Sequence, residues 1–150
     1  VAPGLASTQW SEETQALYAE EEELVEAGDL AGAAEQQAAM WLGPDATDEV
    51  RALTAAMILR SYEQQLPVDG QVLARWPQPA AEARLGGIDV PTLVVTGSDD
   101  LRELHHVAER LGRELPNARL ETIEGAGHLP SLERPDELNG LLLELLHDRV

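Results

Sequence analysis

Apolar residues recur at helical spacing through the first 65 residues, and hardly any stretch there has the alternation of a strand. This pattern predicts three helices, over about 11–27, 30–42 and 47–65. Each begins at a residue whose side chain can cap a helix, and these residues are Ser11, Asp29 and Thr47. Glycine follows the first two predicted helices, which supports their ends.

The pattern changes near residue 90, where short β-branched runs alternate with amphipathic stretches. The runs 90–96 and 118–123 are each followed by glycine and are typical of buried parallel strands. The stretches 101–115 and 135–146 have helical periodicity. Strand, helix, strand and helix joined by short loops form an α/β unit with a parallel sheet.

These patterns divide the chain into a helical region 1–66, a connector 67–90 and an α/β unit 91–150. The connector contains several prolines, and one short helix is expected in it near 79–85. The fold class that we predict is therefore α/β, with two parallel strands, flanking helices and a helical region before them.

Charge and composition exclude several classes of function. The formal net charge of −18 comes from 28 acidic residues against ten basic ones, all arginine, and it disfavours nucleic acid and membrane surfaces as partners. Without cysteine the chain has no disulfide, thiolate nucleophile or cysteine metal site. No apolar run approaches the roughly 18 residues that cross a bilayer, and the start lacks a basic signal-peptide region. We therefore expect a cytoplasmic protein, and its abundant Arg, Ala and Gly suggest a bacterial one.

Two glycine-rich loops follow the predicted strands, and each contains a residue suited to acid–base chemistry. Loop 97–100 has the sequence GSDD, and loop 125–128 has the sequence GAGH. Because the carboxyl ends of adjacent parallel strands meet at one edge of a sheet, a carboxylate on the first loop can reach His128 on the second. Either motif alone also fits an ordinary turn, but their order and their spacing of 28 residues favour a functional pair.

From residue 88 to 146 the sequence resembles the carboxyl-terminal part of the α/β-hydrolase family. The matching stretches are IDVPTLVVTGSDD and ERLGRELPNARLETIEGAGHLPSLERPDELNGLLLELL. In that family the catalytic triad runs serine, acid, histidine along the chain. The resemblance implies that Asp100, with Asp99 as the alternative, is the acid and that His128 is the general base. It also implies the carboxyl-terminal portion of an α/β-hydrolase sheet, preceded by a helical lid.

The resemblance extends upstream more loosely, through AAEQQAAMWLGP and VAPGL. The first of these looks like the lid of lactonase-like and haloperoxidase-like members, where a tryptophan such as Trp41 faces the substrate. Residues 1–66 would then form the lid. We expect Trp41, Met40 and Met57 to line an acyl or lactone pocket, although apolar residues at helical spacing also fit a plain core. The acids that flank the histidine loop, Glu124 and Glu133, are expected to be solvated.

The sequence departs from the family in one respect, because it contains no Gly-x-Ser-x-Gly nucleophile elbow and no oxyanion-hole loop. We therefore expect the serine to lie upstream of residue 1, outside this chain. The chain would be the carboxyl-terminal half of a carboxylic ester or lactone hydrolase that needs no cofactor and no metal, and it would be inactive alone. The alternative is a non-catalytic binding or interaction subunit that retains the hydrolase scaffold.

A partner is expected because two strands are marginal as an isolated sheet. The first strand carries the run Leu93-Val94-Val95, and an open hydrophobic edge of this kind invites pairing with another chain. We predict either a complementary amino-terminal hydrolase segment or a second copy of this chain as the partner. The expected ligand is a small ester or lactone, with neither nucleic acid nor a membrane involved.

Overall fold

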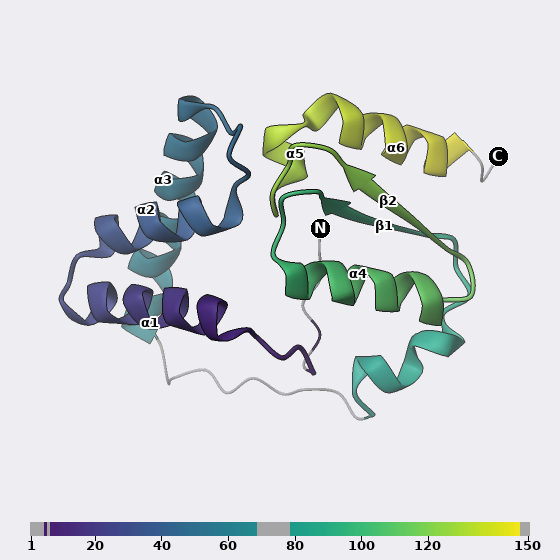
Figure 1. Ribbon diagram of the computed structural model, residues 1–150, viewed down its shortest axis with the longest axis horizontal. Coiled ribbons are helices and arrows are strands. Elements are labelled where there is room, and N and C mark those ends of the chain that lie inside the picture. The colour runs from purple at the N-terminus through teal and green to yellow at the C-terminus, as the bar shows by residue number, and fades with distance from the viewer. Residues whose placement is uncertain (1–4, 6, 69–78, 148–150) are drawn as a thin grey trace.

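A computed structural model describes residues 5, 7–68 and 79–147 of the chain. Three helices, α1 to α3, form one layer of the molecule, and an α/β unit with a two-stranded sheet lies beside it (Figure 1). Within the described residues, no helix is long and apolar enough to cross a membrane.

The helical layer consists of α1 (Glu12–Glu26), α2 (Leu30–Trp41) and α3 (Asp48–Gln65). The three predicted caps are confirmed. The side chains of Ser11, Asp29 and Thr47 accept hydrogen bonds from the backbone N–H of Thr14, Gly32 and Val50. These bonds satisfy N–H groups that have no partner within a helix, which fixes where each helix begins.

Helix α2 lies at the centre of this layer and packs against both α1 and α3. Its buried face consists mainly of Ala33, Ala34 and Ala38. Small side chains allow helix axes to approach closely, so this layer is held together by close backbone packing.

The α/β unit is built on two parallel strands, β1 (Thr92–Gly97) and β2 (Ala118–Ile123), which pair from Thr92 with Ala118 to Gly97 with Ile123. Helix α4 (Arg102–Glu114) covers one face of the sheet, and α6 (Pro135–His147) covers the other (Figure 1). The predicted order of strand, helix, strand and helix is therefore confirmed.

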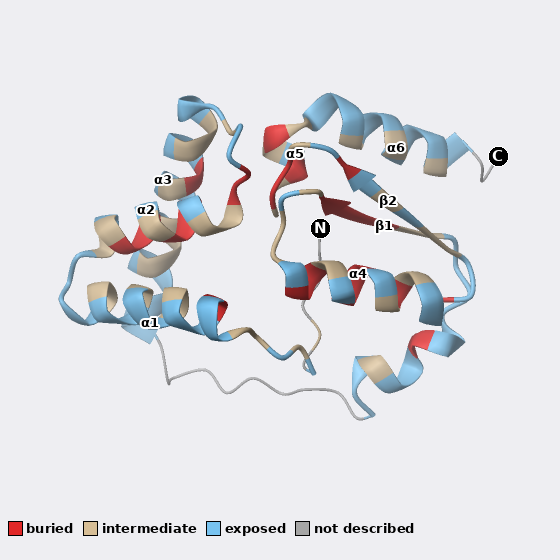
Figure 2. Cartoon of the chain, in the orientation of Figure 1, coloured by how far each residue is buried: buried red, intermediate tan, exposed pale blue. Residues whose placement is uncertain are grey.

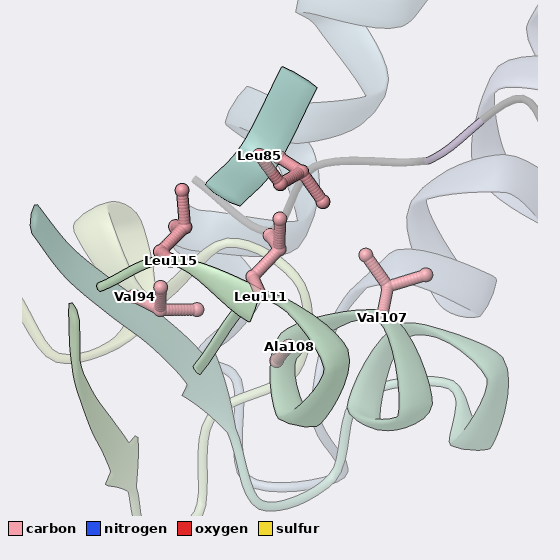
Figure 3. Close-up of a cluster of buried hydrophobic side chains, with 6 residues drawn as sticks. All are labelled: Leu85, Val94, Val107, Ala108, Leu111 and Leu115. Atoms are coloured by element: carbon pink, nitrogen blue, oxygen red, sulfur yellow. The ribbon is translucent and has the colours of Figure 1, made fainter. Parts of the chain in front are cut away.

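Successive residues of β1 point to opposite faces of the sheet, as expected for a strand that is covered on both sides. Val94 belongs to the larger core cluster, formed with α4 and the connector (Figure 3); its members are Leu85, Val94, Val107, Ala108, Leu111 and Leu115. Val95 packs on the other face with Ile123 and Ala126, against Leu138 and Leu141 of α6.

The described part of the connector contains two 3₁₀ helices, η1 (Leu66–Val68) and η2 (Ala81–Gly87). The short helix predicted near 79–85 corresponds to η2, and its Leu85 enters the core. Residues 69–78 of the predicted connector lie outside the described residues.

Two features differ from the sequence pattern. A one-turn helix, α5 (Pro130–Glu133), follows the histidine loop, and it is too short to produce any periodicity. Helix α6 is apolar over more of its circumference than the sheet can cover, so Leu142, Leu143 and Leu146 are exposed although Leu138 and Leu141 pack inward.

Candidate active site

The two loops predicted to hold acid–base residues meet at the carboxyl ends of β1 and β2. The backbone N–H of Ser98 donates to the carbonyl of Ile123, and that of Asp99 donates to the carbonyl of Ala126, both at 2.9 Å. The Ser98 hydroxyl also accepts the N–H of Gly125 at 2.8 Å. Ser98 therefore joins the two loops through both its backbone and its hydroxyl.

Gly97 is required by this close approach. A Cβ added at Gly97 would lie 2.1 Å from the carbonyl oxygen of Ala126 and 2.2 Å from that of Gly127, which no side chain can tolerate. The absence of a side chain lets the two loops lie in direct backbone contact. The glycine that closes the first strand thus brings the histidine loop within reach of the acid.

Asp100 and His128 form a direct pair. The Asp100 Oδ2 atom lies 3.1 Å from Nδ1 of His128, and the other carboxylate oxygen accepts the backbone N–H of Leu101 at 2.8 Å. The Asp100 side chain is 1% exposed, whereas that of His128 is 20% exposed. A carboxylate only accepts, so Nδ1 carries the proton in the neutral ring and Nε2 keeps its lone pair for a reacting group.

The alternative acid, Asp99, is exposed, and the carboxylate that contacts His128 is that of Asp100. Both oxygens of Asp100 are engaged, which fixes the carboxylate plane and with it the direction of the imidazole. This is the arrangement in which an acid orients a general base.

Trp41, at the end of α2, contacts His128 through both its backbone and its ring. Its carbonyl accepts the backbone N–H of His128 at 2.7 Å, and the centroids of the indole and imidazole rings lie 4.6 Å apart at an interplanar angle of 39°. The helical layer therefore reaches the histidine directly.

A chain of hydrogen bonds holds the indole of Trp41 in place. Its Nε1–H donates to Gln37 at 2.7 Å, and the Gln37 amide donates to Glu21 at 2.6 Å. The hydroxyl of Tyr62 donates to the other oxygen of Glu21. Burial, together with this bond to Glu21, raises the pKa of Tyr62. One residue from each of α1, α2 and α3 thus lies behind the ring that contacts His128.

A cavity of about 420 Å³ opens beside His128 between α3 and α5. Its lining is mostly apolar, and it consists of Trp41, Thr54, Met57, Ile58, Ser61, His128, Leu129, Ser131 and Leu132. Of the predicted pocket residues, Trp41 and Met57 are part of this lining and Met40 is not. The hydroxyl of Thr54 is buried in the cavity wall and has no hydrogen-bond partner among the described residues.

Glu133 was expected to be solvated, and that expectation is wrong. The side chain belongs to α5, the residue is only 8% exposed, and its carboxylate accepts backbone N–H groups on both sides of His128. Glu124, by contrast, is exposed as expected. Nothing in the local sequence separates these two acids, because the burial of Glu133 depends on how α5 folds back onto the histidine loop.

Glu103, near the start of α4, is a second buried acid that sequence reasoning did not identify. Its Oε1 atom accepts the backbone N–H of Ser11 at 2.7 Å and the hydroxyl of Thr14 at 3.2 Å. Burial alone would raise the pKa of Glu103, but the hydrogen bonds from Ser11 and Thr14 outweigh it and lower the pKa to about 2. Glu103 therefore joins the start of α1 to the helix that follows Asp100.

The described residues do not assemble a metal site. Among them, no group of three or more His, Asp or Glu side chains could hold a metal ion. His147 places its Nδ1 atom 2.7 Å from the carbonyl of Leu143 within α6.

Known proteins resemble this chain in sequence and in fold. The chain is 37% identical over 67 residues to a proline iminopeptidase of Lactobacillus helveticus, and this alignment covers 43% of this chain and 22% of the peptidase. A thermophilic esterase from Thermogutta terrifontis superposes with a TM-score of 0.70 at 23% identity, over 95% of this chain and 53% of that one. An enzyme described as degrading N-acyl homoserine lactones superposes with a TM-score of 0.57 at 25% identity, over 83% of this chain and 50% of that one.

This chain thus spans about half the length of these solved structures, and its match to the peptidase spans less than a quarter of that protein. The model of the "Alpha/beta hydrolase family" matches residues 2–141, which is nearly the whole chain. The fold is therefore that of an α/β-hydrolase, and the chain belongs to the alpha/beta hydrolase family.

Proposed function

We propose that this chain supplies the acid and the general base of a serine hydrolase that cleaves small carboxylic esters or lactones. The observation that carries the proposal is the 3.1 Å contact between Asp100 and Nδ1 of His128, with the imidazole partly exposed beside an apolar cavity. A buried carboxylate that orients a partly exposed histidine is the arrangement that general-base catalysis requires.

In this proposal Nε2 of His128 removes the proton from a serine hydroxyl as the serine oxygen attacks the acyl carbon. The resulting imidazolium is stabilised by Asp100 and returns the proton to the departing alkoxide, which leaves an acyl-enzyme. Water then attacks the acyl group with the same proton transfers and releases the acid. No atom in this sequence of steps requires a metal or an organic cofactor.

The serine and the oxyanion donors are proposed to lie outside this chain, in a complementary amino-terminal hydrolase segment. The sequence contains no Gly-x-Ser-x-Gly turn, and the solved relatives are about twice as long as this chain. The covered strand β1 supports the same idea. Val94 and Val95 are buried on opposite faces, as in the interior of a larger sheet, yet among the described residues β1 pairs only with β2.

The helical layer is proposed to act as the lid that sets substrate choice. Met57 and Ile58 of α3 form the cavity wall opposite Leu129 and Leu132, so the cavity suits a moderately apolar acyl or alcohol group. The similarity to an esterase and to a lactone-degrading enzyme supports an ester or lactone as the substrate.

A fluorophosphonate probe tests the proposal, because it labels only a serine that a triad activates. The chain is mixed with the complementary segment, and the assembly is treated with the probe in the wild-type and H128A forms. Labelling of a serine that is lost in H128A supports the hydrolase. If no serine is labelled in any assembly, the non-catalytic binding subunit is the better description.

Light scattering of the purified chain tests the proposed partner. We expect poorly defined association of the chain alone. After the amino-terminal segment is added, we expect a mixed complex. A well-behaved monomer would contradict the need for a partner, and a stable homodimer would identify a second copy as the partner instead.

A further inference from the structure

The helical layer and the histidine loop meet along an unusually close backbone contact. Residues 41–43, at the end of α2, lie against the loop before α5, and this region is among the most buried in the molecule (Figure 2). A Cβ added at Gly127 would lie 2.5 Å from the backbone N of Gly43 and 2.7 Å from the carbonyl of Trp41. No side chain fits there, so the two segments are held by the bond from the His128 N–H to the Trp41 carbonyl and by side chains that reach the junction from outside it.

Glu133 bridges this junction. Its Oε1 atom accepts the N–H of Gly127 at 2.9 Å and that of Leu129 at 3.3 Å, the residues on either side of His128. Its Oε2 atom accepts the N–H of Gly43 at 2.7 Å, on the helical layer. One buried carboxylate therefore binds the histidine loop with one oxygen and the helical layer with the other.

The chemistry of this contact requires a carboxylate. All three recorded donors to the Glu133 side chain are peptide N–H groups, and a carboxylate presents only acceptors to them. The amide of a glutamine, which is similar in size, would turn an N–H₂ group toward one of these N–H groups. Loss of either link releases the helical layer and the histidine loop from each other, so the amides on both sides of the junction can open more easily.

The geometry points to Glu133 as a positioning residue that sets the helical layer and His128 relative to each other. It touches neither the imidazole nor the cavity, yet it fixes both neighbours of His128 and the residue two positions after Trp41. We call these three bonds to Glu133 the clamp. The ring contact between Trp41 and His128 and the bond from the His128 N–H to the Trp41 carbonyl both lie between the residues that the clamp holds. The significance of this coupling for catalysis rests on the proposed role of His128.

Amide hydrogen exchange of the whole 150-residue chain tests the coupling without any assay of activity. In E133Q we expect exchange at Gly43, Gly127, His128 and Leu129 to be faster by about tenfold or more, the scale of a lost bond to a charged group. Amides in the ladder between β1 and β2 should keep their wild-type rates. E124Q is the matched control, because it removes the same charge from an exposed position just before the same loop.

Two results would overturn the inference. One is exchange at Gly43 in E133Q that equals the E124Q rate, and the other is a uniform rise over all amides, which would mean that Glu133 only stabilises the fold. If E133Q does not fold, hydrogen-bond scalar couplings in the wild-type chain give the answer instead. Couplings from the amides of Gly43 and Gly127 to the Glu133 carboxyl carbon support the clamp, and their absence contradicts it.

These results are independent of the serine-labelling experiment. If the exchange data support the clamp and no serine is labelled, the proposed hydrolase is refuted and the coupling through Glu133 stands. If a serine is labelled and the exchange data contradict the clamp, the hydrolase stands and the coupling is refuted.

Discussion

The carbonyl of Trp41 accepts the backbone N–H of His128 at 2.7 Å, so the end of α2 and the loop that carries the histidine are joined through the main chain. The ring of Trp41 then lies against the ring of His128, and a polar network from all three helices holds the indole from behind. Residues more than eighty positions apart in sequence therefore form one local structure around the candidate base.

The Asp100 carboxylate should determine which nitrogen of His128 carries the proton. In D100N the amide oxygen can still accept the Leu101 N–H, which turns the amide N–H₂ toward Nδ1 and moves the ring proton to Nε2. Nitrogen NMR of the imidazole should report this change of tautomer, and turnover of the completed enzyme should fall by about 10⁴-fold. D99N is the control, since Asp99 is exposed. An unchanged tautomer in D100N would refute the assignment.

Gln37 should control the position of the Trp41 ring. Q37M keeps the approximate volume but leaves the indole N–H and one Glu21 oxygen without a partner, so we expect a loss of about 1–3 kcal/mol in the free energy of unfolding. The indole N–H resonance of Trp41 should move upfield as its hydrogen bond is lost. Q64L, at an exposed position of α3, should change neither property. A Q37M spectrum identical to wild type would contradict the network.

Glu103 should make the fold sensitive to acid. Because its folded pKa of about 2 lies below the ordinary value of 4.5, its stabilising effect is complete above pH 4.5 and is lost as the pH falls toward 2. E103Q should therefore be less stable than wild type at neutral pH, by at least about 1 kcal/mol, and the difference should shrink at low pH. Urea unfolding between pH 2 and 7 measures this. E109Q, exposed on the same helix, should show no such convergence, and parallel curves for E103Q would contradict the assignment.

Thr14 and Thr54 are equally buried, at 3% exposed, but they should respond to valine with opposite signs. The Thr14 hydroxyl donates to Glu103, so T14V should lower the free energy of unfolding by about 1–3 kcal/mol. The Thr54 hydroxyl has no partner in the part of the chain that the structure describes, so T54V should leave stability unchanged or raise it by up to about 1 kcal/mol. Thermal or urea unfolding measures both variants, and each variant serves as the control for the other. A large loss in T54V would indicate that this hydroxyl has a partner after all.

The sequence predicted those elements whose signals are local. The capped helices begin at Ser11, Asp29 and Thr47, and the two β-branched runs became the parallel strands, because capping and strand burial act over a few residues. The loops that hold Asp100 and His128 lie together because they follow adjacent parallel strands. The carboxyl ends of such strands meet at one edge of the sheet, so this contact could be predicted from the two strands.

Features that depend on distant contacts were not predictable in the same way. The burial of Glu133 and Glu103 arises from backbone N–H groups supplied by other elements, and no pattern near either residue records those donors. The exposure of Leu142 and Leu146 depends on how wide a sheet α6 meets, which periodicity does not encode. For the same reason Met40 and Met57 were equivalent as candidates, although only Met57 lines the cavity.

One side of the cavity wall comes from a stretch of the chain far from the acid–base pair. Met57, Ile58 and Ser61 all belong to α3, whereas Asp100 and His128 sit on loops of the sheet, and α3 reaches His128 indirectly, through Tyr62 and the network behind Trp41. Selection could therefore alter which molecule fits without disturbing how a bond is broken. A combinatorial library restricted to these three α3 positions would be a short route to new selectivity in this scaffold.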